Sequence, residues 1–197
     1  MTIVRTIDQI CEWLNANVCE KVLLKKPPRD KEKTNEKYAY ELIHPYAFPL
    51  YLPVKDMLPP DATAPVPSIC VQMEYGSDDY NNRELNIALG FGSWNAGAHP
   101  KDWLIPEGTD TEYKDKLSHM TEGWRDLWNF VDVAVTAIES SMYMGPDVEI
   151  VKNEPLEFGP YKEQDSIPIL YPYWFAYCRF KVRSMILRNN QDLAEFL

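Results

Sequence analysis

The chain has 197 residues, of which 45% are hydrophobic and 25% charged, as in an ordinary globular protein large enough to bury its own core. A formal net charge of −10 argues against a nucleic-acid-binding surface, because phosphate contacts require clustered lysine and arginine side chains. Neither an apolar run of about 18 residues nor a signal-peptide pattern occurs, so no membrane span and no secretory leader are expected.

The four cysteines are predicted to be free thiols. Cys11 and Cys19 fall on one predicted helix at a spacing of about 12 Å along its axis, which is beyond disulfide reach. Cys70 and Cys178 fall in predicted strands, where they are typical of small buried apolar residues. A reducing cytosol is the compartment that fits this usage.

The apolar spacing of residues 6–24 predicts a first helix that lies against a sheet, with Thr6 and Gln9 at the spacing of a capping box. The proline-rich segment 25–66 predicts an extended chain, because prolines interrupt any long regular element. It contains Tyr46 and Tyr51, whose region is expected to pack either against another chain or within its own domain.

Residues 68–75 and 83–94 alternate between apolar and polar positions, which predicts the two antiparallel strands of a hairpin. On the first strand, one buried face is expected to contain Ile69, Val71, Met73 and Tyr75. The turn between them, GSDDYNN at 76–82, contains Asp78 and Asp79. Acidic residues in such turns cap their own backbone or face water far more often than they hold a cation.

The aperiodic stretch 95–121 contains Trp103 and is too long for a passive connection, so it predicts a functional or locally ordered insertion. The segment 121–143 follows, with Thr121 as the expected N-cap and Gly145-Pro146 beyond its end. Its apolar residues recur every three or four positions and predict one long central helix: Trp124, Leu127, Trp128, Val131, Ala134, Val135, Ile138 and Met142.

Two further strands are predicted after this helix, at 148–158, interrupted by Pro155, and at 171–182. On the last strand, Tyr173, Phe175 and Tyr177 share one face and are apolar enough to require cover by a helix or by another subunit. The predicted core includes Trp124, Leu127, Val131, Ile138 and Trp174.

These elements predict an α+β fold in a single domain over 1–197. A small antiparallel or mixed sheet would pack against the N-terminal helix and the long central helix. No motif of nucleotide-binding, hydrolase or zinc-protease type occurs, and the three histidines are isolated. No catalytic residue, metal ligand or cofactor site is therefore predicted.

The order of motifs nevertheless resembles a known family. A strand enters the acidic turn, a second strand ends in GFGSWN, a helix opens with GWRD at 123–126, and the last strand opens with PYWF at 172–175. Between 67 and 182 this order is similar to that of the tail terminator (tail completion) proteins of long-tailed bacteriophages. In this chain, residues 97–122 are inserted before the helix.

The resemblance implies a structural virion protein, assembled in the host cytoplasm, that forms a ring, typically a hexamer, on the end of the tail tube. Such a ring stops tube polymerisation and provides the head–tail joining surface. The implied partners are further copies of the chain, the tail tube protein, head–tail connector proteins and, in contractile tails, the sheath. An acidic lumen would let DNA pass without binding it.

The candidate subunit or tube interface is predicted to include Asp78, Asp79, Tyr80, Trp94, Trp103, Tyr46 and Tyr51. Exposed strand edges would favour ring formation by strand pairing or by close sheet contacts. Two alternatives remain from the sequence. One is a head–tail connector or sheath-contacting tail-end protein, and the other is an enzyme or small-ligand-binding module with a pocket between helix and sheet.

Overall fold

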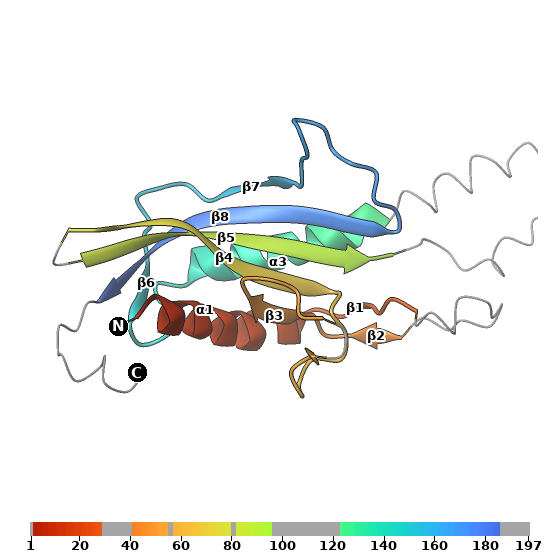
Figure 1. Cartoon of the computed structure of the whole chain (residues 1–197), viewed down its shortest axis with the longest axis horizontal. Coiled ribbons are helices and arrows are strands. Elements are labelled where there is room, and N and C mark those ends of the chain that lie inside the picture. Colours follow the sequence, from red (N-terminus) through yellow and green to blue (C-terminus); the bar gives the residue numbers. More distant parts are fainter. Residues whose placement is uncertain (1, 29–40, 55–56, 80–81, 96–122, 186–197) are drawn as a thin grey trace, which may run out of the picture.

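The computed structural model describes residues 2–28, 41–54, 57–79, 82–95 and 123–185, and Figure 1 shows their arrangement. In this part of the chain the helices are α1 (Ile3–Asn17) and α3 (Gly123–Ser140), and a 3₁₀ turn follows α1 at Cys19–Lys21. The strands are β1 (Leu24–Lys25), β2 (Leu42–Ile43), β3 (Tyr46–Pro49), β4 (Ser68–Asp78), β5 (Asn82–Trp94), β6 (Val148–Ile150), β7 (Glu157–Pro160) and β8 (Tyr173–Met185). The predicted α+β fold class is confirmed.

Six strands form a mixed sheet in the order β3-β4-β5-β8-β6, with β7 also paired to β8. Only β3 runs parallel to its neighbour β4, and the other neighbours are antiparallel. The predicted hairpin is therefore confirmed as β4 and β5. Strand β5 pairs with β8 from Asn82↔Met185 to Trp94↔Tyr173, and this long pair forms the centre of the sheet.

Both helices pack on the same face of the sheet, which we call the inner face. Helix α1 contacts β3 and β4, whereas α3 contacts β5 and β8 and lies behind the long strands in Figure 1. Phe91 of β5 meets Phe130 of α3 edge to face, with ring centroids 5.2 Å apart. The two helices and the inner face share one core, which contains Leu127, Val131 and Ile138 together with Ile69, Val71, Leu85, Ile87, Leu89, Ala176, Cys178, Phe180 and Val182.

Trp124 does not lie in this core, and its prediction as a core residue is wrong. The side chain is 43% exposed, and the Arg125 guanidinium lies over its ring, 5.3 Å from the centroid. The first turn of α3 approaches the sheet through Gly123, where an added Cβ would lie 2.4 Å from Nε1 of Trp174. Trp174 packs against the core there, so Trp124 is left at the rim.

Helix α1 begins and ends earlier than predicted. Its N-cap is Thr2, whose hydroxyl accepts a hydrogen bond from the Arg5 N–H at 3.3 Å, whereas Thr6 is a buried residue inside the helix. The helix ends at Asn17, so Cys19 belongs to the following 3₁₀ turn. All four cysteines are free thiols, as predicted. The predicted N-cap of the central helix, Thr121, lies outside the described residues.

A β-bulge changes the alternation of β4. The register moves from Met73↔Ile87 to Tyr75↔Asn86, so Glu74 is an extra residue in the strand. Tyr75 was predicted to share the buried face of Ile69, Val71 and Met73. Because the bulge shifts the alternation by one residue, Tyr75 is instead 63% exposed.

The strand predicted at 148–158 is two separate strands, because the chain leaves the sheet between β6 and β7 around Pro155. Lys152 lies in this connection, and its ammonium donates to the carbonyl oxygens of Ile138 and Glu139 at 2.8 and 2.7 Å. These carbonyls belong to the last turn of α3, where a cation is favourable. The connection therefore ties the end of α3 to the sheet edge.

Candidate assembly surface

No described helix covers the opposite, outer face of the sheet. There β5 contributes small residues at alternate positions, and Gly90 and Gly92 lie opposite Tyr177 and Phe175 of β8. A Cβ added at Gly92 would lie 3.3 Å from the Phe175 ring, so this ring packs close to the bare backbone of β5. The glycines therefore form part of the floor of a groove that Phe175 of β8 borders.

This groove has a volume of about 340 Å³. No residue along it carries a charge at neutral pH, and burial raises the pKa of the Cys70 thiol to about 11, so this group stays neutral as well. A groove of this kind favours an apolar partner, because it offers no counterion to a charged one. Its lining residues are Leu52, Ser68, Cys70, Gln72, Gly90, Phe91, Gly92, Tyr161, Leu170, Phe175 and Ala176.

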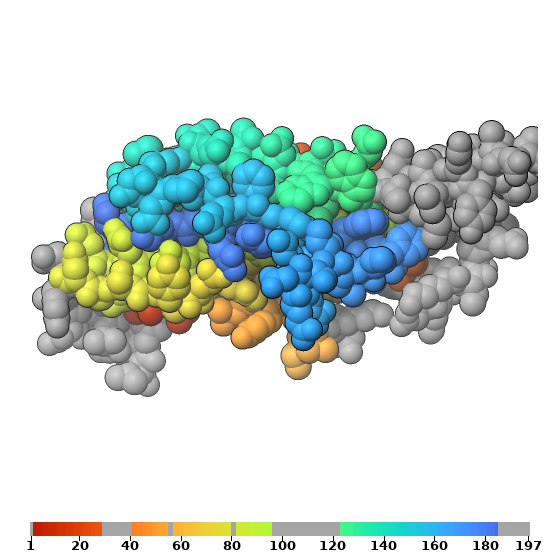
Figure 2. Space-filling model, turned by 90° about the horizontal axis from the view of Figure 1, so that it is seen from above, coloured from red at the N-terminus to blue at the C-terminus, as the bar shows by residue number. Residues whose placement is uncertain are grey.

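Two apolar segments border the groove, and we call them the first bank (50–57) and the second bank (161–173). Figure 2 shows both projecting on the same side of the molecule, the first in orange and the second in blue. Large apolar side chains on the described part of the banks are unusually exposed: Leu50 45%, Tyr51 75%, Leu52 40%, Val54 70%, Met57 76%, Tyr161 45%, Ile167 62%, Ile169 95%, Leu170 44%, Tyr171 39% and Tyr173 37%.

The second bank is held by a tight turn. Glu163 and Ser166 exchange backbone hydrogen bonds of 2.8 and 3.0 Å, and the two residues between them, Gln164 and Asp165, have φ angles of 47° and 63°. Two consecutive positive φ angles are typical of the type I′ hairpin turn. Ile167 and Ile169 follow this turn directly, so a defined backbone structure presents them to solvent.

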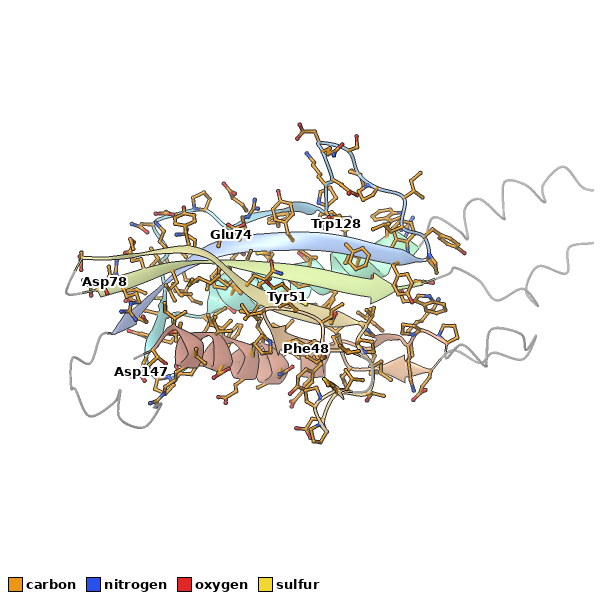
Figure 3. All side chains as sticks on the ribbon, viewed as in Figure 1. Phe48, Tyr51, Glu74, Asp78, Trp128 and Asp147 are labelled. Carbon is orange, nitrogen blue, oxygen red and sulfur yellow. The ribbon has the colours of Figure 1, made fainter. Side chains whose placement is uncertain are left out.

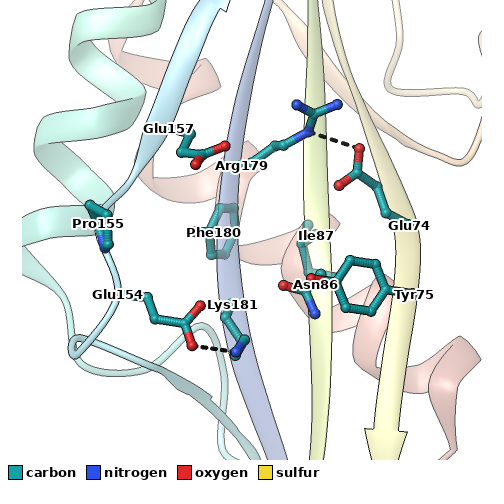
Figure 4. Close-up of a pocket in the computed structure, with 10 residues that line it drawn as sticks. All are labelled: Glu74, Tyr75, Asn86, Ile87, Glu154, Pro155, Glu157, Arg179, Phe180 and Lys181. Atoms are coloured by element: carbon teal, nitrogen blue, oxygen red, sulfur yellow. Dashed lines mark hydrogen bonds and ion pairs between the residues drawn. The ribbon is translucent and has the colours of Figure 1, made fainter.

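The far half of the outer face is charged, and its charges are paired. Figure 4 shows this half, where Arg179 donates to Glu74 at 2.8 Å and Lys181 pairs with Glu154. Further along, Arg183 donates to Glu84 at 2.8 Å, and its guanidinium lies 3.6 Å from Glu149. The hydrogen bond that Lys181 donates to Glu154 is the main cause that raises the pKa of Lys181. Each of these three cations therefore has a carboxylate partner within the subunit.

The edge of the sheet at β3 is poorly suited to adding another strand. The N–H groups of Tyr46 and Leu50 donate to β4 and the segment before it. The backbone nitrogens of the odd-numbered residues 45, 47 and 49 therefore point away from β4, toward the open edge. Two of those positions, 45 and 49, are prolines without an N–H, and the N–H of Ala47 donates to the Asn15 side chain at 2.8 Å. Prolines and a side-chain cap block strand addition at this edge.

Those predicted interface residues that the structure describes do not lie together. Asp78 and Asp79 lie at the tip of the hairpin, and Figure 3 shows Asp78 far from Tyr51. Trp94 lies at the opposite end of β5, about 40 Å away at roughly 3.4 Å per residue, and is only 6% exposed. Tyr46 is half-buried in β3, whereas Tyr51 lies on the first bank. Tyr80, Trp103 and nearly all of the predicted insertion lie outside the described residues.

Sequence reasoning did not identify the groove, although its signals were present. Gly90 and Gly92 occupy the non-core positions of one predicted strand, and Phe175 and Tyr177 occupy those of another. Small residues on one strand, paired with aromatic residues on the next, predict a groove that the aromatic side chains border. The register that places them opposite each other was not available from the sequence, because it joins residues more than 80 positions apart.

The described residues offer little for catalysis. Burial raises the pKa of Cys11, Cys19 and Cys178 to about 12, so these thiols stay protonated and are poor nucleophiles at neutral pH. No cluster of His, Cys, Asp or Glu that could hold a metal ion occurs in the ranges that the structure describes. Neither of the two described helices is long and apolar enough to cross a membrane.

Comparisons with known proteins did not assign the chain to a family. Neither a scan of protein-family models nor a search of curated proteins found a match.

Proposed function

We propose that this chain is a structural virion protein, a tail terminator that forms a ring on the end of a phage tail tube. The motif order between 67 and 182 motivates this function. The observation that carries it is the bare outer sheet face with its two apolar banks. A monomer gains nothing by presenting so many large apolar side chains to water, whereas a subunit of an assembly buries them.

The area is of the size that an assembly requires. Full burial of one aliphatic side chain removes roughly 60–120 Å² of apolar surface from water, so the exposed parts of the banks amount to on the order of 600 Å². This is at the upper end of the apolar patches found on monomers and close to the ~800 Å² per partner of a stable protein–protein interface.

In this proposal the ring blocks the growing end of the tube, and its other side joins the head through connector proteins and, in a contractile tail, meets the sheath. No reaction and no cofactor are required. The net charge of −10 per subunit is compatible with a lumen through which DNA slides without being bound.

Tube polymerisation in the presence of this chain tests the function. The purified tube protein of the same phage would be assembled with and without it, and tube lengths measured by electron microscopy. We expect shorter tubes with a ring at one end, and native mass spectrometry should show a closed oligomer. A chain that stays monomeric and leaves tube lengths unchanged would contradict the proposal. A particle map that places the chain away from the tube end would favour a connector instead.

A further inference from the structure

We infer that the groove on the outer sheet face binds the second bank of a neighbouring copy of this chain, with Ile167 and Ile169 as the inserted side chains. The inference rests on the proposed function insofar as that function requires self-association. It goes further by assigning the contact, its two sides and its direction. Of the two modes expected from the sequence, strand pairing and close sheet contacts, it selects contact with a sheet face.

The groove and the second bank have matching chemistry. The groove is uncharged and floored by Gly90 and Gly92, which leave space above the backbone of β5. Ile169 is 95% exposed and Ile167 is 62% exposed, and no described residue covers either side chain. A volume of about 340 Å³ accommodates a few aliphatic side chains, and an aliphatic side chain gains about 1.5–3 kcal/mol when it is fully buried.

A second copy of the chain is favoured over other occupants of the groove, because the structure disfavours strand addition at β3 and charged ligands in the groove. The β3 edge is blocked by Pro45, Pro49 and the Asn15 cap, so a partner is not expected to add a strand there. A nucleic acid or an acidic peptide would find no positive charge in the groove. The chain itself carries the apolar, turn-supported segment that the groove fits, and copies of the chain are present wherever the chain is.

The contact joins two different surfaces and is therefore heterologous. Ile167 and Ile169 of one copy occupy the groove of the next, whose own Ile167 and Ile169 remain free for a third copy. Such head-to-tail contacts close into rings when the rotation between neighbours allows it. This direction of assembly agrees with the ring proposed above.

Two variants disable opposite sides of the contact. Ile169→Asp places a carboxylate on the inserted segment, and because the residue is 95% exposed, folding should be unaffected. Gly90→Leu fills the floor of the groove, where the nearest atoms to an added Cβ lie at ordinary contact distances of 3.9 and 4.0 Å, so a side chain can begin there without a clash. Val4→Asp, on the exposed side of α1 at 61% exposure, is the matched control.

Sedimentation velocity on the full chain tests the contact. At roughly 100 μM, well above the micromolar Kd of weak interfaces of this size, wild type and Val4→Asp should associate. Each of the other two variants should associate about tenfold more weakly or not at all, with unchanged circular dichroism. An equimolar mixture of the two should form a one-to-one complex, because the Gly90→Leu copy keeps an intact second bank and the Ile169→Asp copy keeps an intact groove.

A disulfide experiment measures the contact directly. A Cys70→Ser/Ile169→Cys chain is mixed with wild type, whose Cys70 lines the groove, and oxidised at alkaline pH because burial raises the pKa of the Cys70 thiol to about 11. A covalent dimer between the two kinds of chain is expected. Association that Gly90→Leu and Ile169→Asp both leave intact, a mixture of these two variants that stays monomeric, or a monomeric wild type would overturn the inference.

The two proposals can fail separately. If wild type caps tubes as a ring that Gly90→Leu and Ile169→Asp both still form, the docking inference is wrong and the tail-terminator function stands. If the one-to-one complex and the disulfide appear but wild type has no effect on tube length, the docking inference stands and the proposed function is wrong.

Discussion

The two halves of the outer sheet face are built on the same strands, β5 and β8, yet they present opposite chemistry. Toward Gly92 and Phe175 the face is apolar and hollow, and two apolar segments border it. Toward Glu84 and Arg183 it is covered by ion pairs that link β4, β5, β8 and the connection before β7. Neither half is packed beneath a described helix.

The difference shows how a sheet face can remain stable in water. The charged half needs no partner, because each lysine and arginine named above has a carboxylate within reach inside the subunit. No described group inside the subunit covers the apolar half, so only burial against another molecule removes its surface from water. An exposed sheet face is therefore not by itself a docking site, and its side-chain chemistry decides whether it requires a partner.

The largest expected effect is a difference in the free energy of unfolding between a core substitution and a groove substitution. Phe91 and Gly90 are adjacent on β5 but point to opposite faces. Phe91→Ala removes a ring that is 1% exposed and packed on Phe130, so it should lower the free energy of unfolding by about 3–5 kcal/mol. Gly90→Ala should raise it by about 0.5 kcal/mol, because a strand glycine has excess backbone freedom. Urea unfolding measures both, and a large loss at Gly90 would mean that the groove belongs to the core.

A smaller effect is expected in the charged half. Glu84 accepts from Arg183 and also lies 3.8 Å from the Lys181 ammonium. Glu84→Gln should destabilise the fold by about 1 kcal/mol in low salt and by less in 1 M NaCl, because partly exposed ion pairs are weak and screened. Glu157→Gln is the control, since Glu157 lies on β7 opposite Arg179 and has no ion pair among the described residues. Equal effects of both variants would contradict the paired-charge interpretation.

Alkaline pH should weaken the same network selectively. The pKa of Lys181 is raised above its ordinary 10.5, chiefly by the hydrogen bond that its ammonium donates to Glu154. A raised pKa in the folded state means that this stabilisation is fully present below pH 10.5 and is lost as the pH rises through the folded-state value. The stability difference between wild type and Lys181→Met should therefore be constant at neutral pH and shrink in strongly alkaline solution. A difference that grows there would contradict the sign.

The smallest expected effect is a change in the rate at which the Cys70 thiol in the apolar half is modified. Cys70 is the only one of the four cysteines that is not fully buried, so it should react first with a maleimide. With a pKa of about 11, roughly one thiol in 10⁴ is ionised at pH 7, so the reaction should be slow. Concentrations that favour self-association should slow it further in wild type but not in Ile169→Asp. Mass spectrometry of the labelled chain measures the rate.

The elements that sequence periodicity predicted best are those whose signals are local. The alternation in β5 and β8 and the three-to-four spacing in α3 depend on neighbouring residues alone, and all three elements lie where the patterns indicated. The errors concern tertiary packing. Trp124 has the spacing of a core residue, but Gly123 and Trp174 make the contact with the sheet. Tyr75 follows the alternation of β4, but the bulge at Glu74 reverses its face.

By itself the sequence determined the α+β class, the hairpin, the long central helix and the absence of familiar catalytic motifs, because each follows from spacing within a short window. Only the tertiary structure decided that one sheet face stays bare, that Gly90 and Gly92 lie beside the aromatic side chains of β8, and that Asn15 closes the β3 edge. These features join residues that lie far apart in the chain. Their positions depend on strand register and on which face the helices cover, and neither of these can be read from local periodicity.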